Sequence, residues 1–314
     1  MRSGLISEFL RNAGWINATR NLLAGDASKR QYQRLSLNGT TAILMDAPPE
    51  AGEDTRLFEN LAEYLQQEGF AAPEIIAADH ETGLLLIEDL GPNTVAQHLS
   101  AHPEDEEEIY KQTAQLLAKL AKIEAPRGLL KLRSELAAEM LEPFFEYAAP
   151  QSQRRTILDS IKGLFDVFRG EDLVFSLRDF HSENLIWRKN AAGNARLGLL
   201  DFQDAFAAPT GYDLASFLRD ARRDASNSAT SLAICQFAEI TGRAADDVEA
   251  RIAILSVQRN LRILGIFAKL IMVENKPGYR KFVPRVRQHI QNDLLHSVFD
   301  GHRAPIQMAL ERIS

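Results

Sequence analysis

The sequence is poor in cysteine and contains no long apolar run. Its single cysteine, Cys235, excludes an internal disulfide framework and fits a reducing cytoplasm. Because Cys235 lies in an apolar stretch, we expect it to pack in the core rather than to act as a nucleophile. The first six residues lack the apolar core and the cleavage site of a signal peptide, so we expect a cytoplasmic protein.

Membrane and nucleic-acid partners are not expected. The longest apolar stretch near the C-terminus, residues 263–273, is interrupted by Lys269 and is too short to span a bilayer. A formal net charge of −7 argues against nucleic acid as the main partner. With 45% hydrophobic and 25% charged residues, the composition is that of an ordinary globular protein. We expect a soluble monomer.

Residues 1–90 show the pattern of a small lobe built around an antiparallel sheet. Residues 30–37 alternate like a strand with one buried face, Asn38-Gly39 signals a two-residue hairpin turn, and residues 41–45 form the returning strand. Helical spacing of apolar residues predicts a main helix over residues 54–68, after a short one over residues 6–13. Residues 75–78 and 84–87 predict a second hairpin.

Beyond Pro92 the pattern is mainly helical. A helix opens in the acidic run 104–108, and further helices are expected over residues 132–146, 155–168, 212–221, 228–241, 245–273 and 279–298. Two short strand-like segments, residues 173–177 and 196–200, interrupt this series. The predicted fold class is therefore α+β, with an N-lobe over residues 1–90 and a large, mainly helical C-lobe over residues 91–314.

Polar residues gather at the ends of those two short strands. Asp179 and Asn184 follow the first strand and Asp201 ends the second, so a hairpin would bring them together at one edge. Phosphoryl transfer needs a carboxylate that orients the acceptor hydroxyl and takes its proton, and oxygen ligands that hold Mg²⁺ against the phosphates of ATP. Asp179 fits the first role, and Asn184 and Asp201 fit the second.

The full string is more specific. Asp-x4-Asn, followed by an apolar strand that ends in Asp-Phe, resembles the aminoglycoside phosphotransferase and choline kinase group. The continuation over residues 201–205 and 212–220 looks like the sugar kinases that phosphorylate N-acetylmuramate and N-acetylglucosamine at the 1-hydroxyl during cell-wall recycling. Residues 44–49, 85–91, 258–260 and 265–267 agree, so the resemblance covers nearly the whole chain.

The resemblance implies a protein-kinase-like bilobal fold, ATP and Mg²⁺ as cofactors, and a small-molecule acceptor. Residues 25–28 would form a lid over the phosphates, and the segment 88–90 would meet the adenine. The implied ATP-binding residues are Ser28, Arg30, Ile43, Leu86, Glu88 and Leu90. The implied acceptor residues are His181, Asp204, Tyr212, Arg219 and Arg259, of which an arginine would suit a lactyl carboxylate. Asp213 would support the catalytic loop.

Two departures from the family pattern stand out. Leu177 replaces the usual histidine that props the catalytic loop, and residues 41–45 lack the lysine that typical kinases pair with the ATP phosphates. Lys29, Arg30 or Arg34 could supply that positive charge. Glu59 is the implied counterpart of the family's helix glutamate, but without the lysine its partner stays open.

Alternative functions stay open at this point. The acceptor could be an aminoglycoside, choline or another alcohol, although the arginines in residues 219–223 favour an anionic or neutral acceptor. The two departures also leave room for a nucleotide-binding pseudokinase that acts as an interaction module.

Overall fold

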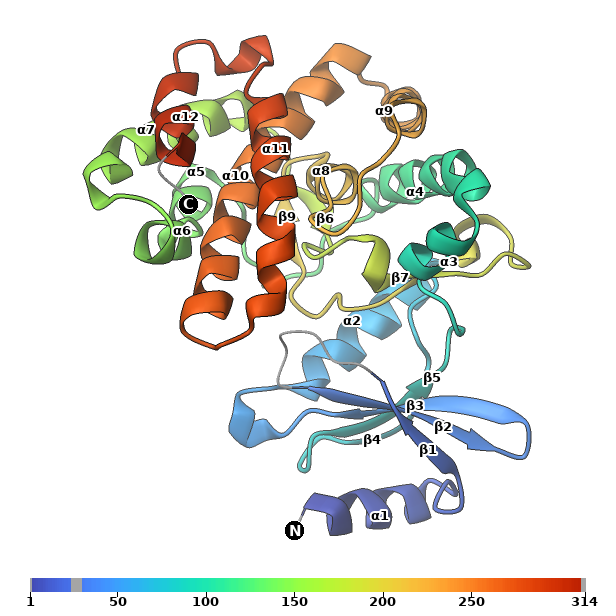
Figure 1. Ribbon diagram of the computed structural model, residues 1–314. Coiled ribbons are helices and arrows are strands. Elements are labelled where there is room, and N and C mark those ends of the chain that lie inside the picture. Colours follow the sequence, from blue (N-terminus) through green and yellow to red (C-terminus); the bar gives the residue numbers. More distant parts are fainter. Residues whose placement is uncertain (1, 24–29, 312–314) are drawn as a thin grey trace. The chain divides into compact units, whose positions relative to one another are not determined.

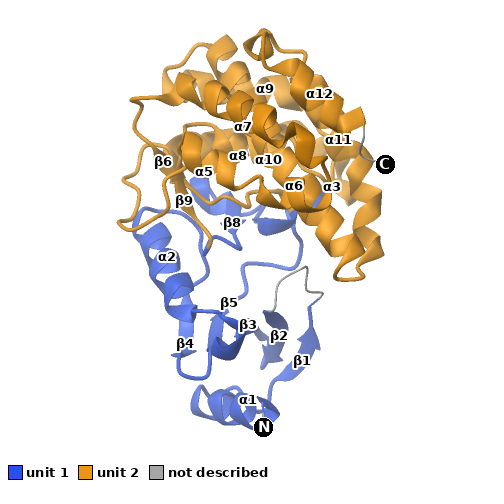
Figure 2. Ribbon diagram, turned by 90° about the vertical axis from the view of Figure 1, so that its left-hand side faces the viewer, with its two compact units in different colours: residues 1–98, 183–203 blue, residues 99–182, 204–314 orange. Residues whose placement is uncertain are grey.

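The computed structural model describes residues 2–23 and 30–311, which divide into two compact units (Figures 1 and 2). Unit 1 comprises residues 1–98 and 183–203, and unit 2 comprises residues 99–182 and 204–314. This division by compactness differs from the predicted lobe boundary at residues 90 and 91, because residues 183–203 group with the N-terminal part of the chain. The predicted phosphate lid, including Ser28, lies outside the described residues.

Unit 1 contains a five-stranded antiparallel sheet in the order β1-β2-β3-β5-β4. The strands are β1 (Thr19–Leu22), β2 (Gln31–Leu37), β3 (Thr40–Asp46), β4 (Ile75–Asp79) and β5 (Leu84–Glu88). Asn38 and Gly39 both have positive φ, 52° and 81°, as a two-residue hairpin turn requires, so the predicted β2–β3 hairpin is confirmed. Strand β1 was not predicted, because all four of its residues are exposed and give no alternation.

Unit 1 also contains helices and a pair of short strands outside the five-stranded sheet. Helix α1 (Arg2–Asn12) buries Phe9 and Leu10 against side chains from one face of the sheet, among them Leu44 and Leu86. Helix α2 (Thr55–Gln67) begins at Asp54, whose side chain accepts a hydrogen bond from the Arg56 N–H. Strands β7 (Leu185–Trp187) and β8 (Leu197–Leu199) pair with each other.

Unit 2 is mainly helical, as predicted. Its helices are α4 (Glu106–Leu120), α5 (Ser134–Glu139), α6 (Glu142–Tyr147), α7 (Arg154–Phe165), α8 (Tyr212–Leu218), α9 (Asn227–Thr241), α10 (Ala245–Met272), α11 (Val283–Asp293) and α12 (Arg303–Glu311). Helix α3 (Val95–Ala101) joins the two units in the chain. The long α10 packs against α6, α8, α9 and α11 (Figure 1). At its contact with α6, a Cβ on Gly265 would lie 2.2 Å from the backbone nitrogen of Phe144, so only glycine fits.

Several expectations about unit 2 were wrong in detail. The helix expected over residues 132–146 is two helices, and that expected over residues 279–298 is a 3₁₀ segment (Pro277–Phe282), α11 and a second 3₁₀ segment (Ser297–Phe299). The two strand-like segments do not form a hairpin with each other: β6 (Val174–Ser176) pairs with β9 (Phe206–Ala208), and β8 pairs with β7. Cys235 is exposed on α9 rather than packed in the core. None of the described helices could cross a membrane.

Candidate active site

The loop that follows β6 is held by a buried carboxylate. Asp213, in the first turn of α8, accepts hydrogen bonds from the hydroxyl of Ser176 at 2.7 Å and from the backbone N–H groups of Leu177 at 2.7 Å and Arg178 at 3.0 Å. Arg178 has a φ of 71°, which is costly for a residue with a side chain and therefore needs such support. Asp213 thus holds the loop that follows β6, and its role in supporting a catalytic loop stays a prediction.

Leu177 contributes only its backbone to this support. Its side chain is buried, with 2% of its surface exposed. Burial raises the pKa of the Asp213 carboxyl to about 6, although the hydrogen bonds from Ser176, Leu177 and Arg178 act in the opposite direction. The loop is therefore held in its conformation without the histidine that the family usually has.

Asp179 lies on this loop beside three arginines. The Nη2 atom of Arg259 is 4.0 Å from the Oδ1 atom of Asp179. Burial acts to raise the pKa of Asp179, but the positive charges of Arg259, Arg262 and Arg178 outweigh it, so the pKa lies below its usual value. Asp179 is therefore ionised at neutral pH, as a proton acceptor must be.

Arg259 and Arg262 lie three residues apart in α10, which places both on one face of the helix. Arg262 was not among the predicted site residues. The spacing Arg259-x-x-Arg262 in a predicted helix was the signal that could have identified it. The Tyr212 hydroxyl also interacts with this group, and it is buried without a hydrogen-bond partner among the described residues.

The predicted acceptor residue His181 is buried near Asp220. Burial lowers the pKa of the His181 imidazole to about 4, so the ring is neutral at physiological pH. Its Nδ1 atom has no hydrogen-bond partner in the part of the chain that the structure describes. Asp220 accepts hydrogen bonds from the Ser182 hydroxyl at 2.7 Å and the Ser182 N–H at 3.3 Å, which holds the end of the loop.

The other predicted acceptor residues are placed differently. Arg219 forms an ion pair with Asp293 of α11, in which its Nε and Nη2 atoms donate to Oδ1 at 3.0 Å and 2.9 Å. Asp204 is exposed, and its backbone carbonyl accepts a bond of 3.5 Å from the Arg178 guanidinium. Unlike Arg259, neither residue is brought to Asp179 by a described contact, and their acceptor roles stay predictions.

The two predicted magnesium ligands lie side by side in unit 1. Asn184 immediately precedes β7 and Asp201 follows β8, so the β7–β8 pairing brings them together, with Asn184 Nδ2 3.2 Å from Asp201 Oδ2. Gln203, which was not predicted, donates to Asp201 Oδ1 at 2.7 Å. Asp201 has a φ of 56°, a further strained position that this packing maintains. Carboxylate and amide oxygens suit Mg²⁺, which commonly takes one or two protein ligands together with phosphate oxygens.

Of the three candidates for the missing positive charge, Lys29 lies outside the described residues, and Arg30 lies beside Asp201. Its Nη1 atom lies 3.4 Å from Asp201 Oδ1, and its Nε atom donates to Glu53 at 2.6 Å. Arg34 instead pairs with Asp89 at 2.8 Å and donates to the Gly91 carbonyl at 2.8 Å. Of these two arginines, Arg30 is therefore the one near the predicted metal ligands.

Glu59 also has an unexpected partner. Its carboxylate lies 2.7 Å from Nε2 of His80, whose Nδ1 atom is 2.8 Å from the Thr55 hydroxyl. Glu59, on α2, is thus connected to the β4–β5 turn rather than to a lysine of β3.

The predicted adenine contacts do not all share one surface. Leu86 pairs with Leu44, and both lie in the core beneath α1. Ile43, the residue before Leu44, pairs with Ile87. Because side chains alternate along a strand, Ile43 and Leu86 face opposite sides of the sheet and cannot both contact one adenine ring. Glu88 lies 3.7 Å from the Arg188 guanidinium, and Leu90 is buried beside Gly198.

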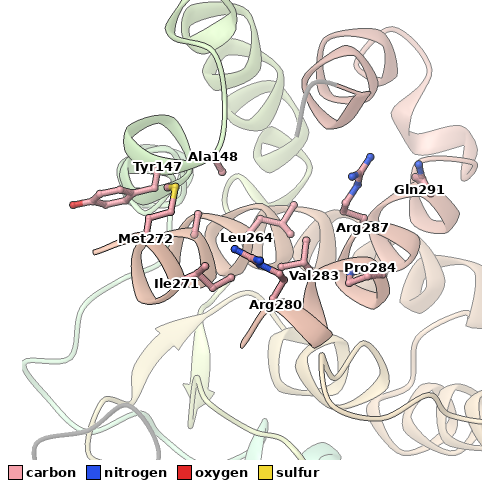
Figure 3. A pocket seen from close by; sticks show the side chains of 11 residues that line it. Tyr147, Ala148, Leu264, Ile271, Met272, Arg280, Val283, Pro284, Arg287 and Gln291 are labelled. Carbon is pink, nitrogen blue, oxygen red and sulfur yellow. The ribbon is translucent and has the colours of Figure 1, made fainter. Parts of the chain in front are cut away.

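A groove of about 760 Å³ lies beside α10, between α6 and α11 (Figure 3). It is lined by Leu264, Ala268, Ile271 and Met272 of α10, by Tyr147 of α6 and by residues of α11. At 3.6 residues per turn these four positions face away from Arg259 and Arg262. The groove, which also includes Arg280, is therefore separate from the group around Asp179.

Comparison with known proteins assigns the chain to a family. Residues 19–253 match the family model described as "Phosphotransferase enzyme family". The chain is 31% identical to the N-acetylmuramate/N-acetylglucosamine kinase of Caulobacter vibrioides, with 91% of this chain and 90% of that protein covered.

Solved structures show the same fold. A choline/ethanolamine kinase family protein from Mesorhizobium loti superposes with a TM-score of 0.69 at 13% identity, covering 98% of this chain and 100% of that one. The ADP-bound aminoglycoside phosphotransferase APH(2'')-Ib gives a TM-score of 0.62 at 12% identity, covering 94% and 99%. These structures have a kinase-like α+β fold, which confirms the predicted fold class. From its match to the family model over most of its length, the chain is a member of the phosphotransferase enzyme family.

Proposed function

We propose that the protein transfers the γ-phosphoryl group of ATP to the anomeric hydroxyl of N-acetylmuramate or N-acetylglucosamine. Two observations support the proposal: in unit 2, Asp179 is ionised and lies on a loop held by Asp213, and in unit 1, Asn184 and Asp201 are hydrogen-bonded to each other. The name of the Caulobacter relative supports the sugar acceptor, and ADP in a solved structure of this fold supports a nucleotide donor. We also keep the predictions that the protein is cytoplasmic and monomeric.

On the donor side, Asn184 and Asp201 would hold Mg²⁺, which when bound neutralises charge on the phosphate oxygens. Arg30 would supply the positive charge that a lysine of β3 provides in typical kinases. Gln203 would orient the Asp201 carboxylate through the 2.7 Å hydrogen bond between them. Of the predicted adenine contacts, Ile43 and the backbone of residues 88–90 are retained.

On the acceptor side, Asp179 would accept a hydrogen bond from the anomeric hydroxyl and take its proton as the oxygen attacks phosphorus. The anomeric hydroxyl is more acidic than an ordinary alcohol, so a carboxylate is a sufficient base. Arg259 would keep Asp179 ionised until the proton arrives. Positioning and charge neutralisation would account for most of the rate enhancement.

Rival functions are less well supported. Aminoglycosides and choline are cations, and the arginines around Asp179 disfavour a cationic acceptor. The pseudokinase alternative was motivated by Leu177 and by the absent lysine. The hydrogen bonds to Asp213 and the guanidinium of Arg30 would substitute for both, which favours an active enzyme.

One experiment tests the proposal. The purified protein is incubated with Mg-ATP and, separately, with N-acetylmuramate, N-acetylglucosamine and kanamycin, while ADP release is followed and products are identified by NMR. We expect a 1-phosphate of one or both amino sugars. Phosphorylation of kanamycin alone would instead favour an antibiotic kinase, and ATP binding without turnover of any acceptor would favour a pseudokinase.

A further inference from the structure

The side chains around Asp179 include one guanidinium group that no contact among the described residues satisfies. Three guanidinium groups, those of Arg178, Arg259 and Arg262, interact with this one carboxylate. Of the other polar groups in the cluster, His181 and Tyr212 are neutral at physiological pH, and the Asp213 and Asp220 carboxylates already accept hydrogen bonds from the loop.

The three arginines differ in what they contact. Arg259 lies 4.0 Å from the Asp179 carboxylate. Arg178 donates to the backbone carbonyl of Asp204 and lies over the Phe206 ring, 5.8 Å from its centroid. Arg262 has neither a hydrogen-bond acceptor nor an ion-pair partner within residues 2–23 and 30–311, although its side chain is partly buried and burial lowers its pKa.

A partly buried guanidinium without an acceptor is unfavourable, because it has lost water and gained no replacement. The cost is removed if a bound anion completes the site. Arg262 shares its helix face with Arg259, so the two planar groups can bind one carboxylate together, and guanidinium geometry matches a carboxylate well.

We propose that Arg262 binds the carboxylate of an acidic acceptor and thereby sets the preference of the enzyme for N-acetylmuramate over N-acetylglucosamine. The inference rests on the proposed function. The two sugars share the ring, the N-acetyl group and the anomeric hydroxyl, and only N-acetylmuramate carries a lactyl carboxylate. Arg262 is a specificity-determining residue in this scheme, while Asp179 serves both acceptors alike.

The test compares kcat/KM for both sugars at saturating Mg-ATP in the wild type, Arg262→Gln and Arg262→Lys. We expect Arg262→Gln to lower kcat/KM for N-acetylmuramate by about ten- to hundredfold, the effect of one charge-assisted interaction, and to change that for N-acetylglucosamine by less than about threefold. Arg262→Lys should retain an intermediate preference. Any effect through the pKa of Asp179 would lower both activities equally, so the ratio isolates carboxylate binding.

Arg280→Gln is the matched control, because Arg280 borders the groove on the far face of α10. It should leave both activities unchanged. An equal loss on both sugars in Arg262→Gln, or no loss on either, would overturn the inference.

Calorimetric binding separates this inference from the proposed function. If the wild type phosphorylates neither sugar, the proposed function fails. The inference then stands only if N-acetylmuramate binds more tightly than N-acetylglucosamine and Arg262→Gln abolishes that difference. Equal affinities, or no binding of either sugar, would overturn it.

Discussion

The Asp213 carboxylate lies 2.7 Å from the backbone nitrogen of Leu177, so a residue of α8 holds the loop that carries Asp179. Because three donors lose their acceptor in Asp213→Ala, we expect a loss of about 2–4 kcal/mol in the free energy of unfolding and a more than tenfold fall in kcat. Urea denaturation and ADP release measure the two effects. Leu177→His should not raise kcat, since the loop already has its support; a clear gain would show that support was missing.

The same carboxyl predicts a pH dependence. Its pKa is about 6 in the folded protein against 3.8 ordinarily, so the folded state holds this proton more tightly than the unfolded one. Its contribution to stability is therefore complete below about pH 4 and is lost as the pH rises through 6. Turnover, in contrast, should increase as the pH rises through 6, because ionised Asp213 is the better acceptor for the loop N–H groups.

The pH profile of kcat in Asp213→Asn tests this assignment. The low pKa of Asp179 keeps it ionised across this range, so it should not produce the acidic limb. In the variant the limb near pH 6 should disappear from whatever activity is left. An unchanged limb would assign it to another group.

Loss of either central carboxylate should remove activity without unfolding the protein. Asp179→Asn cannot accept the proton, and Asp201→Ala removes a ligand of the proposed metal site. We expect ADP release to fall to background in both, with melting temperatures close to that of the wild type. Asp159→Ala, at an exposed position of α7, serves as the control. Near-normal turnover by Asp201→Ala would refute its role as a metal ligand.

Arg30 should affect the nucleotide rather than the sugar. Since its guanidinium lies 3.4 Å from Asp201, we expect Arg30→Gln to raise KM for Mg-ATP by about tenfold, as for one lost charged interaction, with little change in KM for the sugar. Arg30→Lys should recover part of the loss. Arg20→Gln on the exposed strand β1 is the matched control. A selective change in the sugar KM would contradict this assignment.

Gly265 tests the packing of α6 against α10. The added methyl group in Gly265→Ala would meet the Phe144 backbone at 2.2 Å, so we expect a loss of about 1–3 kcal/mol in the free energy of unfolding. Gly4→Ala on α1 has open space around the new methyl group and should be neutral or slightly stabilising. Equal effects of the two substitutions in urea denaturation would show that the α6 backbone can shift to accommodate the added methyl group.

Local patterns predicted much of the fold. The Asn38-Gly39 turn and the helix at residues 54–68 were clear because turn chemistry and helical periodicity act over short distances. Strand β1 carries no such pattern, and the pairing of β6 with β9 depends on a strand about thirty residues away. Long-range pairing leaves little trace in a single sequence.

The candidate site likewise contains residues that local sequence patterns identified and residues that they did not. Asp179, Asn184 and Asp201 were proposed from spacing and residue type. The ion pair that engages Arg219 was not foreseeable, because Asp293 lies 74 residues away on another helix. Arg262 was missed for the converse reason: it lacks an ion-pair partner among the described residues, and a missing contact can be recognised only in a three-dimensional structure.

The exposed thiol of Cys235 has a practical consequence. As the chain contains no other cysteine, a maleimide dye or spin label will react at one known position on α9 without any mutagenesis. A second label at an engineered cysteine in unit 1, for example in place of exposed Arg20, would report the distance between the two units. Measuring that distance with and without nucleotide would show directly whether the enzyme closes around its substrates.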